Sequence, residues 1–292
     1  MPELPEVETV KRGLARLLSS RQITGVDFDT PKSFPNALHD VQRFLVGAHI
    51  TTVDRRAKIL IIGLDTGYSL LIHLKMTGQL VFRSNDDKER FGAGHPNDSL
   101  VHALPDKSTR VVFDLGDAKL FFNDQRKFGW VRLVPTIEIP HLDFMKKIGP
   151  EPLAADFTAT EFLERLQRRK RSAIKAVLLD QTVIAGVGNI YADESLWGAK
   201  IHPSTVVQNI SKRKLALLFT ELQQVLRLSI DKGGSTDKNY VNAEGKKGSY
   251  MTFARVFRRE GQSCPRCGHY IKKIRVAGRG THVCPKCQRR AA

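Results

Sequence analysis

The chain has no cysteine before Cys264 and no long apolar segment. A transmembrane helix needs about 20 consecutive apolar residues, and no run in this sequence approaches that length. The acidic start, Met1-Pro2-Glu3-Leu4-Pro5-Glu6, is unlike the basic leader of a secreted protein. These absences argue against a membrane-spanning or secreted protein, and we expect a soluble cytoplasmic one.

Acidic residues are scarce relative to basic ones. The 292 residues include 47 Lys and Arg but only 30 Asp and Glu, which gives a formal net charge of +17. This excess says nothing about the fold, but it predicts attraction to a polyanion, nucleic acid first and an anionic membrane second. A chain of this length can bury a substantial core and form two domains with a small appendage.

The four cysteines form two C-x-x-C pairs near the C-terminal end, Cys264 with Cys267 and Cys284 with Cys287. Their spacing predicts a tetrahedral four-cysteine zinc site with a hairpin between the two knuckles. Disulfide bonds are the alternative, which is weak for a leaderless chain in a reducing compartment. Because four thiolates fill the coordination shell of zinc, we expect one structural Zn²⁺ per chain. Basic residues around the knuckles favour contact with phosphates.

The first residues carry the candidate chemistry. The small residue at position 2 permits removal of Met1, which would leave Pro2 with a secondary amine of reference pKa about 8. Such an amine can attack an electrophilic carbon and form a cationic iminium, and Glu3 beside it can move protons. The alternative is an ordinary proline-started helix with a solvated acidic first turn. Taken alone, these residues favour that alternative.

A buried helix is predicted to fix this terminus. Pro5 suits the first helical turn, and apolar residues follow at intervals of three and four. They are Val7, Val10, Leu14, Leu17 and Leu18.

Short β-branched or aromatic stretches separated by turn residues predict eight strands between residues 22 and 134. The strands are 23–28, 50–55, 59–64, 69–74, 79–83, 110–115, 119–123 and 130–134. Such a series is typical of a β-sandwich or barrel. Asp65-Thr66-Gly67 and Leu115-Gly116-Asp117 predict hairpin turns. The polar, glycine-containing stretch from Ser84 to Lys107 predicts a long mobile loop.

Three connections in this part mix cations with apolar or aromatic side chains. They are Arg55-Arg56-Ala57-Lys58, His73-Leu74-Lys75-Met76-Thr77-Gly78 and Asn123-Asp124-Gln125-Arg126-Lys127-Phe128-Gly129. The combination suits phosphate anchoring together with a wedge between bases. A strand end with a packed aromatic ring and scattered charges is as good an explanation for any single loop, but three such loops favour the first interpretation.

After Gly149-Pro150-Glu151-Pro152 the pattern changes to helices, which predicts a domain boundary there. Helices are predicted around 162–166, 174–178 and 215–230. Gly186-Val187-Gly188-Asn189 precedes another helix, whose N-terminal amides could hold a phosphate, although the glycine pair alone is a weak signal. The polar stretch 233–252 could close over a ligand or merely link domains.

Together these motifs resemble the bacterial formamidopyrimidine-DNA glycosylase family (Fpg) nearly from end to end. The resemblance covers the N-terminal Pro2 to Thr9, the three loops above, the Gly186 to Tyr191 segment and the finger with Gly278-Arg279-Gly280-Thr281-His282. It implies an α+β fold with a β-sandwich domain, a helix-two-turn-helix domain and a zinc-finger hairpin, with DNA between the two domains. The expected limits are 1–135 for the first domain, 136–154 for a linker, 155–255 for the helical domain and 256–292 for the finger.

The resemblance also implies chemical roles. Pro2 would attack C1′ of a damaged nucleotide flipped from the duplex, and the iminium would permit β- then δ-elimination. Glu3 would be the general acid/base and Glu6 would support the site. Lys58 would bind the lesion's phosphate and donate a proton in elimination, and Arg279 is also expected in the catalytic set. The expected substrates are 8-oxoguanine and formamidopyrimidines in double-stranded DNA.

DNA contacts are implied for a second group of residues. Those expected to hold the phosphate backbone are His73, Arg126, Lys170, Asn189 and Arg279. Those expected to fill the gap left by the everted base are Met76, Arg126 and Phe128. The loop from Ser235 to Thr252 would cover the oxidised purine.

The stretch from Ser84 to Lys107 is longer than the family pattern leads us to expect. The chain also departs from that pattern at Lys107-Ser108-Thr109-Arg110, where many members have Lys-His-x-His. Arg110 could replace a histidine contact to DNA there. Two other readings remain open: an endonuclease VIII-like enzyme for oxidised pyrimidines, which the N-terminal motif and the Met/Arg/Phe wedge disfavour, and a zinc-finger DNA-binding protein without catalysis. We expect a bacterial monomer that works in the cytoplasm with the nucleoid.

Overall fold

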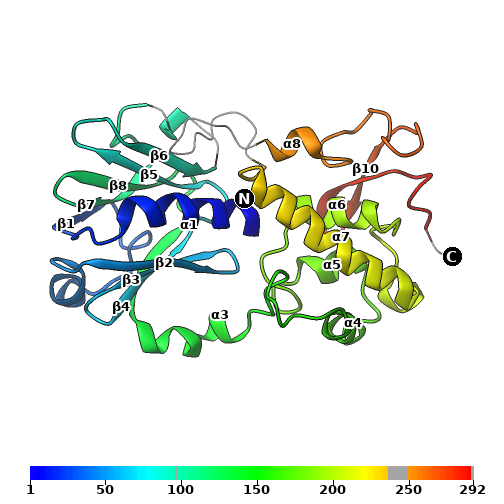
Figure 1. Cartoon of the computed structure of the whole chain (residues 1–292), viewed down its shortest axis with the longest axis horizontal. Helices are drawn as coiled ribbons and strands as arrows, with labels where there is room; N and C mark the ends of the chain where they lie inside the picture. The colour runs from blue at the N-terminus through cyan, green and yellow to red at the C-terminus, as the bar shows by residue number, and fades with distance from the viewer. Residues whose placement is uncertain (96–97, 101, 236–248, 291–292) are drawn as a thin grey trace. The chain divides into compact units, whose positions relative to one another are not determined.

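The computed structural model describes residues 1–95, 98–100, 102–235 and 249–290. The chain divides into two compact units, which Figure 1 shows in one view. The first unit contains Met1–Lys146 and Ile230–Met251, and the second contains Lys147–Ser229 and Thr252–Ala292. No helix of the described residues is long and apolar enough to cross a membrane.

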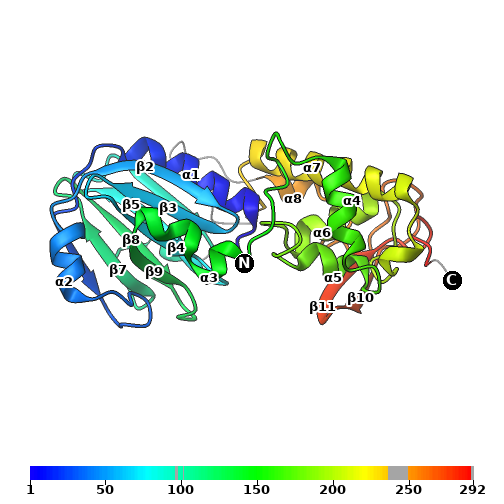
Figure 2. The ribbon, with the colours of Figure 1, turned by 90° about the horizontal axis from the view of Figure 1, so that it is seen from below.

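The first unit is built from two antiparallel sheets (Figure 2). A five-stranded sheet has the order β1-β7-β8-β5-β6, and a four-stranded sheet has the order β2-β3-β4-β9. The strands are β1 Gly25–Phe28, β2 Ile50–Arg56, β3 Ile59–Leu64, β4 Tyr68–His73, β5 Gly78–Ser84, β6 Arg90–Gly94, β7 Thr109–Asp114, β8 Ala118–Asp124 and β9 Trp130–Pro135. Alternate residues of both sheets pack into one apolar core. All eight strands predicted from the sequence are present.

The hairpin turns expected at Gly67 and Gly116 are also confirmed. Both glycines have positive φ, +77° and +80°, in the connections between β3 and β4 and between β7 and β8. Glycine adopts this left-handed backbone without the penalty that a Cβ brings.

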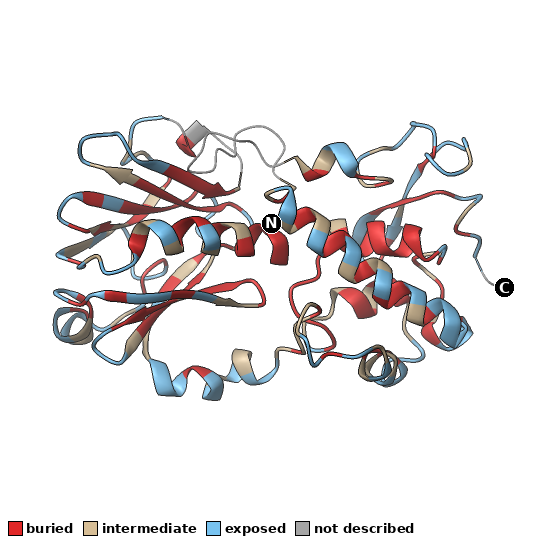
Figure 3. Cartoon of the chain, viewed as in Figure 1, coloured by how far each residue is buried: buried red, intermediate tan, exposed pale blue. Residues whose placement is uncertain are grey.

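Helix α1, Leu4–Leu18, runs along the edge of this sandwich between β2 and β6 (Figure 1). Of the five apolar residues predicted for its buried face, Val7, Val10, Leu14 and Leu18 are fully buried. The fifth, Leu17, is partly buried and packs against the same core. Figure 3 shows the buried residues along α1. Pro5 stands in the first turn, where its missing N–H has no helical partner to lose. The short helices of this unit are α2 Leu38–Asp40 and α3 Asp143–Lys146.

The expectation of a long loop from Ser84 to Lys107 was wrong. Strand β6 lies inside this stretch and pairs with β5, from Gln79 opposite Gly94 to Arg83 opposite Arg90. Phe91 is buried against α1 at Gly13, where an added Cβ would collide with the phenyl ring. Residues 90–94 pack in the sandwich as a strand, and the Phe91 ring occupies a place on α1 where Gly13 has no side chain.

The second unit is helical and ends in a two-stranded hairpin. Its helices are α4 Ala159–Gln167, α5 Ile174–Leu179, α6 Asn189–Gly198 and α7 Lys212–Asp231, of which the last two residues of α7 belong to the first unit. Helix α8, Tyr250–Phe253, is divided between the units and follows residues 236–248, which lie outside the described part of the chain. The hairpin pairs β10 Lys272–Val276 with β11 Arg279–Val283. The helices predicted at 162–166, 174–178 and 215–230 and the α+β class are therefore confirmed.

Candidate active site and metal centre

The start of α1 is a buried acidic cluster. Pro2 is buried and Glu3 is only 4 % exposed. The backbone N–H of Glu3 donates to Oε2 of Glu6 at 2.8 Å, and the backbone N–H of Ser235 donates to Oε1 of the same carboxylate at 2.8 Å. Glu6 therefore ties the first turn of the helix to residue 235, where the stretch predicted to cover the lesion begins. Most of that stretch, 236–248, lies outside the described residues.

The turn between β2 and β3 carries Lys58, which is 7 % exposed. The turn is anchored to α1 by Arg55, whose Nε donates to Oε2 of Glu8 at 2.8 Å. Burial alone would raise the pKa of the Glu8 carboxyl, but Arg55, Arg12 and Lys11 together lower it below its ordinary value. Ala57, next to Lys58, has a left-handed φ of +54°. This ion pair thus fixes a strained turn relative to α1, which begins directly after Glu3.

His73, the last residue of β4, is a neutral hydrogen-bond donor. Burial and the charges of Lys75 and Lys58 lower its pKa to about 3. Its Nδ1 accepts the backbone N–H of Lys75 at 3.0 Å, so the proton of the neutral ring is on Nε2. Sequence reasoning identified the residue but not its charge state.

The buried ring gives a pH-dependent contribution to stability. Because the pKa of His73 is about 3 in the folded chain and 6.5 ordinarily, the unfolded chain binds a proton first as the pH falls. The contribution of the neutral ring to the free energy of unfolding is fully present above pH 6.5 and is lost as the pH falls from 6.5 to about 3. As the pH falls through this window, we expect the unfolding free energy of wild type to decrease relative to that of His73→Gln by up to about 1.4 kcal/mol per pH unit. Urea unfolding at pH 7, 6 and 5 measures this, and a constant difference would contradict it.

Two loops bring together the side chains expected to fill the gap left by the flipped base. Nη1 of Arg126 lies 3.2 Å from Sδ of Met76, and the guanidinium stands 4.8 Å from the centre of the Phe128 ring. Met76 is 39 % exposed and Phe128 45 %, which is unusual for apolar side chains of this size. The structure therefore groups one cation and two exposed apolar groups on one surface.

Arg110 does not face outward as the predicted DNA contact requires. It is 7 % exposed, and all three nitrogens of its guanidinium donate within the protein. The acceptors are Oδ2 of Asp29 at 2.6 Å, the carbonyl of Asp124 at 2.8 Å and the carbonyl of Lys107 at 2.8 Å. This geometry argues against a direct contact and favours a supporting role for the loop that follows β8.

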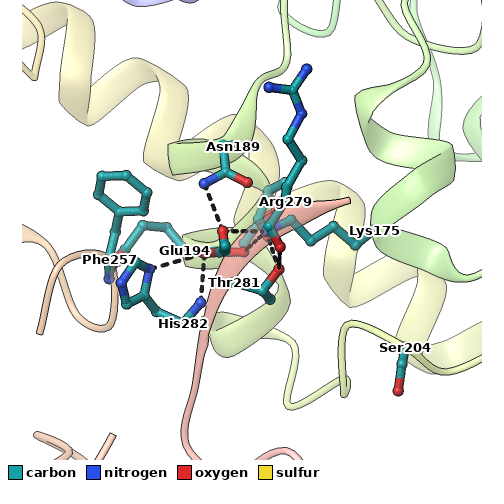
Figure 4. Close-up of polar contacts among 12 residues, drawn as sticks. Lys175, Asn189, Glu194, Ser204, Phe257, Arg279, Thr281 and His282 are labelled. Carbon is teal, nitrogen blue, oxygen red and sulfur yellow. Dashed lines mark hydrogen bonds and ion pairs between the residues drawn. The ribbon is translucent and has the colours of Figure 1, made fainter. Parts of the chain in front are cut away.

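In the second unit, Asn189 and the tip of the hairpin form one polar group (Figure 4). Nδ2 of Asn189, the first residue of α6, donates to the carbonyl of Gly280 at 3.0 Å, and the exposed Arg279 precedes that glycine. Lys170 is exposed after α4, and none of the contacts known for the described residues joins it to this pair. The structure thus brings Asn189 to the hairpin residue next to Arg279, and these are two of the five residues predicted to bind phosphate.

A buried ion pair that the sequence analysis missed supports this group. Nζ of Lys175 donates to Oδ1 of Asp193 at 2.6 Å, and both charged side chains are 0 % exposed. The same Nζ donates to Oγ1 of Thr281 at 2.7 Å (Figure 4). The other oxygen of Asp193 accepts the backbone N–H of His282 at 2.8 Å. The pair joins α5 and α6 to β11. A single lysine inside the apolar run Ile174 to Leu179 was the available signal.

The four cysteines fit a zinc ion. Their sulfurs all lie within 4.8 Å of one another, with 3.5 Å between Cys267 and Cys284 and 4.0 Å between Cys264 and Cys287. A tetrahedral site with Zn–S bonds of about 2.3 Å separates its sulfurs by about 3.8 Å. Burial and neighbouring sulfurs raise the pKa of the Cys287 thiol to about 12, so a divalent cation is needed to hold all four as thiolates. The ion is structural, because no position remains for water.

The zinc centre packs directly on α6. Nε1 of Trp197 lies 3.4 Å from Sγ of Cys264, and Arg266 stacks 3.8 Å from the indole centre while its Nη1 donates to the carbonyl of Trp197 at 2.9 Å. The zinc-binding segment thus packs on the helix whose first residue, Asn189, donates to the carbonyl of Gly280 in the hairpin.

Comparison with known proteins identifies this arrangement. Residues 1–131 match the formamidopyrimidine-DNA glycosylase N-terminal domain, 148–240 match the H2TH domain of the same enzymes, and 261–290 match a zinc finger found in FPG and IleRS. A formamidopyrimidine-DNA glycosylase of Pelotomaculum thermopropionicum is 40 % identical over 99 % of both chains.

Solved structures agree with this result. A Lactococcus lactis Fpg in complex with DNA containing N7-benzyl-Fapy-dG is 35 % identical, with a TM-score of 0.86 over 99 % of this chain and 100 % of that one. The L. lactis Fpg with abasic-site DNA has the same coverage and TM-score at 34 % identity. The fold and the zinc centre define a zinc-finger DNA-repair glycosylase. The chain belongs to the formamidopyrimidine-DNA glycosylase family, which removes damaged bases in base excision repair, and the predicted helix-two-turn-helix domain is confirmed.

Proposed function

We propose that the chain is a bifunctional DNA glycosylase and abasic-site lyase for oxidised purines, with the amine of Pro2 as nucleophile. The observation that carries the proposal is the buried start of α1, where Pro2 adjoins Glu3 and the Glu6 carboxylate binds the Glu3 amide. This terminus is held by hydrogen bonds and an apolar helix face, whereas most chain ends are loose. Such fixation suits a nucleophile that must reach one sugar carbon.

The chemistry follows from the nature of a secondary amine. Once Met1 is removed, the lone pair of the Pro2 nitrogen forms a bond to C1′, and the electrons of the N-glycosidic bond leave with the base, which takes a proton supplied by Glu3. Opening of the deoxyribose ring gives an iminium cation. This electron sink permits loss of a C2′ proton and β-elimination of the 3′ phosphate, followed by δ-elimination of the 5′ phosphate.

The remaining residues hold and distort the DNA in this proposal. Neutral His73, donating from Nε2, and Lys58 bind phosphates beside the lesion, and the hairpin group of Asn189 and Arg279, together with Lys170, binds others. Arg279 also belongs to the catalytic set. Met76, Arg126 and Phe128 fill the gap in the stack, which offsets the few kcal/mol of unstacking. The DNA containing N7-benzyl-Fapy-dG or an abasic site that the L. lactis relative binds supports recognition of formamidopyrimidine and abasic lesions.

The test is borohydride trapping on three duplexes that contain 8-oxoguanine opposite cytosine, thymine glycol or a preformed abasic site. The proposal expects a covalent complex through residue 2 with the 8-oxoguanine and abasic duplexes, and faster excision of 8-oxoguanine than of thymine glycol. Absence of any trapped complex would overturn the lyase step. Faster excision of thymine glycol would place the chain with the enzymes for oxidised pyrimidines.

A further inference from the structure

One buried carboxylate organises the exposed surface formed by Met76, Arg126 and Phe128. Asp124, the last residue of β8, is 0 % exposed. Its Oδ2 accepts the backbone N–H groups of Phe128 at 2.8 Å and Gly129 at 2.7 Å. Its Oδ1 accepts the backbone N–H of Arg126 at 3.2 Å and the hydroxyl of Thr77. Four donors from two loops therefore meet on one side chain, which only an ionised carboxylate can satisfy.

The amides held by Asp124 flank a strained residue. Lys127 has a φ of +54°, in the left-handed region that costs a residue with a Cβ about 1 kcal/mol. The loop closes tightly after it: a Cβ on Gly129 would stand 2.7 Å from Cζ of Phe122 and 3.0 Å from the carbonyl oxygen of His73. The Asp124 carboxylate thus binds backbone amides on both sides of Lys127 and stabilises its left-handed conformation, which is otherwise unfavourable.

The loop that carries Met76 is built in the same way. Lys75 has a φ of +49°, and a Cβ on Gly78 would stand 2.6 Å from Cα of Leu74. Thr77 connects this loop to the other, since its hydroxyl donates to Asp124 and its oxygen accepts the Arg126 N–H at 3.1 Å. The relative placement of the Met76 and Arg126 side chains therefore depends on the Asp124 carboxylate.

The ion pair between Arg110 and Asp29 supports the backbone of Asp124. The Nε of Arg110 donates to the Asp124 carbonyl at 2.8 Å, while its Nη1 binds Asp29 at 2.6 Å. Nζ of Lys127 lies 3.6 Å from the same Asp29 carboxylate. The loop is thus fixed at both the carbonyl and the carboxylate of one residue.

We propose that Asp124 is a positioning residue for base extrusion: its buried carboxylate holds Met76, Arg126 and Phe128 in the arrangement that enters the base stack. This inference rests on the proposed function, because it assigns Asp124 to the step that precedes attack by Pro2. Because its side chain is fully buried, the residue acts through the loops that it holds. Its loss affects substrates from which a base must be extruded and spares those that need no extrusion.

The test compares two substrates in one preparation of Asp124→Asn. Asparagine has nearly the same shape, but its NH₂ group cannot accept the Phe128 and Gly129 amides. Excision of 8-oxoguanine from duplex DNA is expected to fall roughly 10- to 100-fold, since extrusion involves a few kcal/mol. Borohydride trapping on a single-stranded oligonucleotide with an abasic site, which has no stack to open, is expected to change less than about 3-fold.

A fluorescent base reports extrusion directly. 2-Aminopurine beside the lesion brightens when the stack opens, and this rise is expected with wild type and to be lost with Asp124→Asn. The matched control is Asp114→Asn. Asp114 also accepts a backbone N–H, that of Gly116 at 2.8 Å, but it lies at the turn between β7 and β8, at the opposite end of β8 from Asp124. The control is expected to resemble wild type in both assays.

The ratio of the two substrate rates decides the inference, because the fraction of folded protein cancels in it. A ratio unchanged from wild type overturns the positioning role. Should Asp124→Asn fold poorly, Thr77→Val removes one donor and keeps the carboxylate, and its ratio is expected to fall in the same direction by a smaller factor. A wild-type chain that cannot be trapped on any substrate overturns the proposed function itself, which is a different result.

Discussion

Replacing Pro2 with leucine is expected to abolish borohydride trapping and to slow excision of an oxidised purine by at least about 1,000-fold. A bulky residue at position 2 prevents removal of Met1, so the nitrogen of residue 2 stays in a peptide bond. Its lone pair is then delocalised into the carbonyl and cannot attack C1′. Intact-mass measurement verifies that Met1 is retained, and single-turnover gel assays measure excision and trapping.

Two controls separate loss of the nucleophile from damage to the helix. Pro5→Ala changes the other buried proline of this turn, which carries no free amine, and trapping is expected to stay near wild type. Glu3→Gln keeps the amine but removes the proton source, so excision is expected to fall while trapping on preformed abasic DNA persists. Wild-type excision by a Pro2→Leu chain that still carries Met1 would refute the assignment of the nucleophile.

Local spacing was enough to predict the elements that depend on local physics. Neighbouring residues alone indicate the apolar face of α1, the eight short β-branched or aromatic strands and the two C-x-x-C pairs. The glycines at 67 and 116 marked their turns for the same reason, because only the local backbone decides where φ is positive.

Contacts between distant residues were not predictable in this way. Strand β6 is rich in glycine and flanked by polar residues, and it becomes a strand because Phe91 packs against Gly13 of another element. Arg110 looked like a surface cation, since nothing near it in sequence shows that Asp29 neutralises it. The charge state of His73 likewise depends on burial and on Lys58, which lies in a different turn.

Removal of the Lys175 ammonium is expected to destabilise the second unit by about 3–5 kcal/mol. In Lys175→Met the Asp193 carboxylate stays fully buried without its lysine partner, and Oγ1 of Thr281 loses a donor at 2.7 Å. The cost comes mainly from the unpaired charge and not from lost packing, because methionine fills nearly the same volume. Denaturant unfolding followed by Trp197 fluorescence in a Trp130→Phe background reports on this unit, since these are the two tryptophans of the chain.

A double variant tests this explanation. Lys175→Met combined with Asp193→Asn removes both charges, so it is expected to recover a large part of the stability that Lys175→Met alone loses. A double variant no more stable than the single one would show that the charge of Asp193 is not the cause.

The functional effect is expected to appear at the hairpin tip. Thr281 and His282 are the residues of β11 that the ion pair holds, and Gly280, which receives the Asn189 amide, lies next to them. If the pair aligns Asn189 with Arg279 on a phosphate, Lys175→Met binds an uncleavable abasic-site analogue more weakly and with a shallower salt dependence than wild type. The zinc content stays at one ion per chain, because the four cysteines are untouched. Unchanged salt dependence in a folded variant would show that the ion pair stabilises the fold but does not contribute to DNA binding.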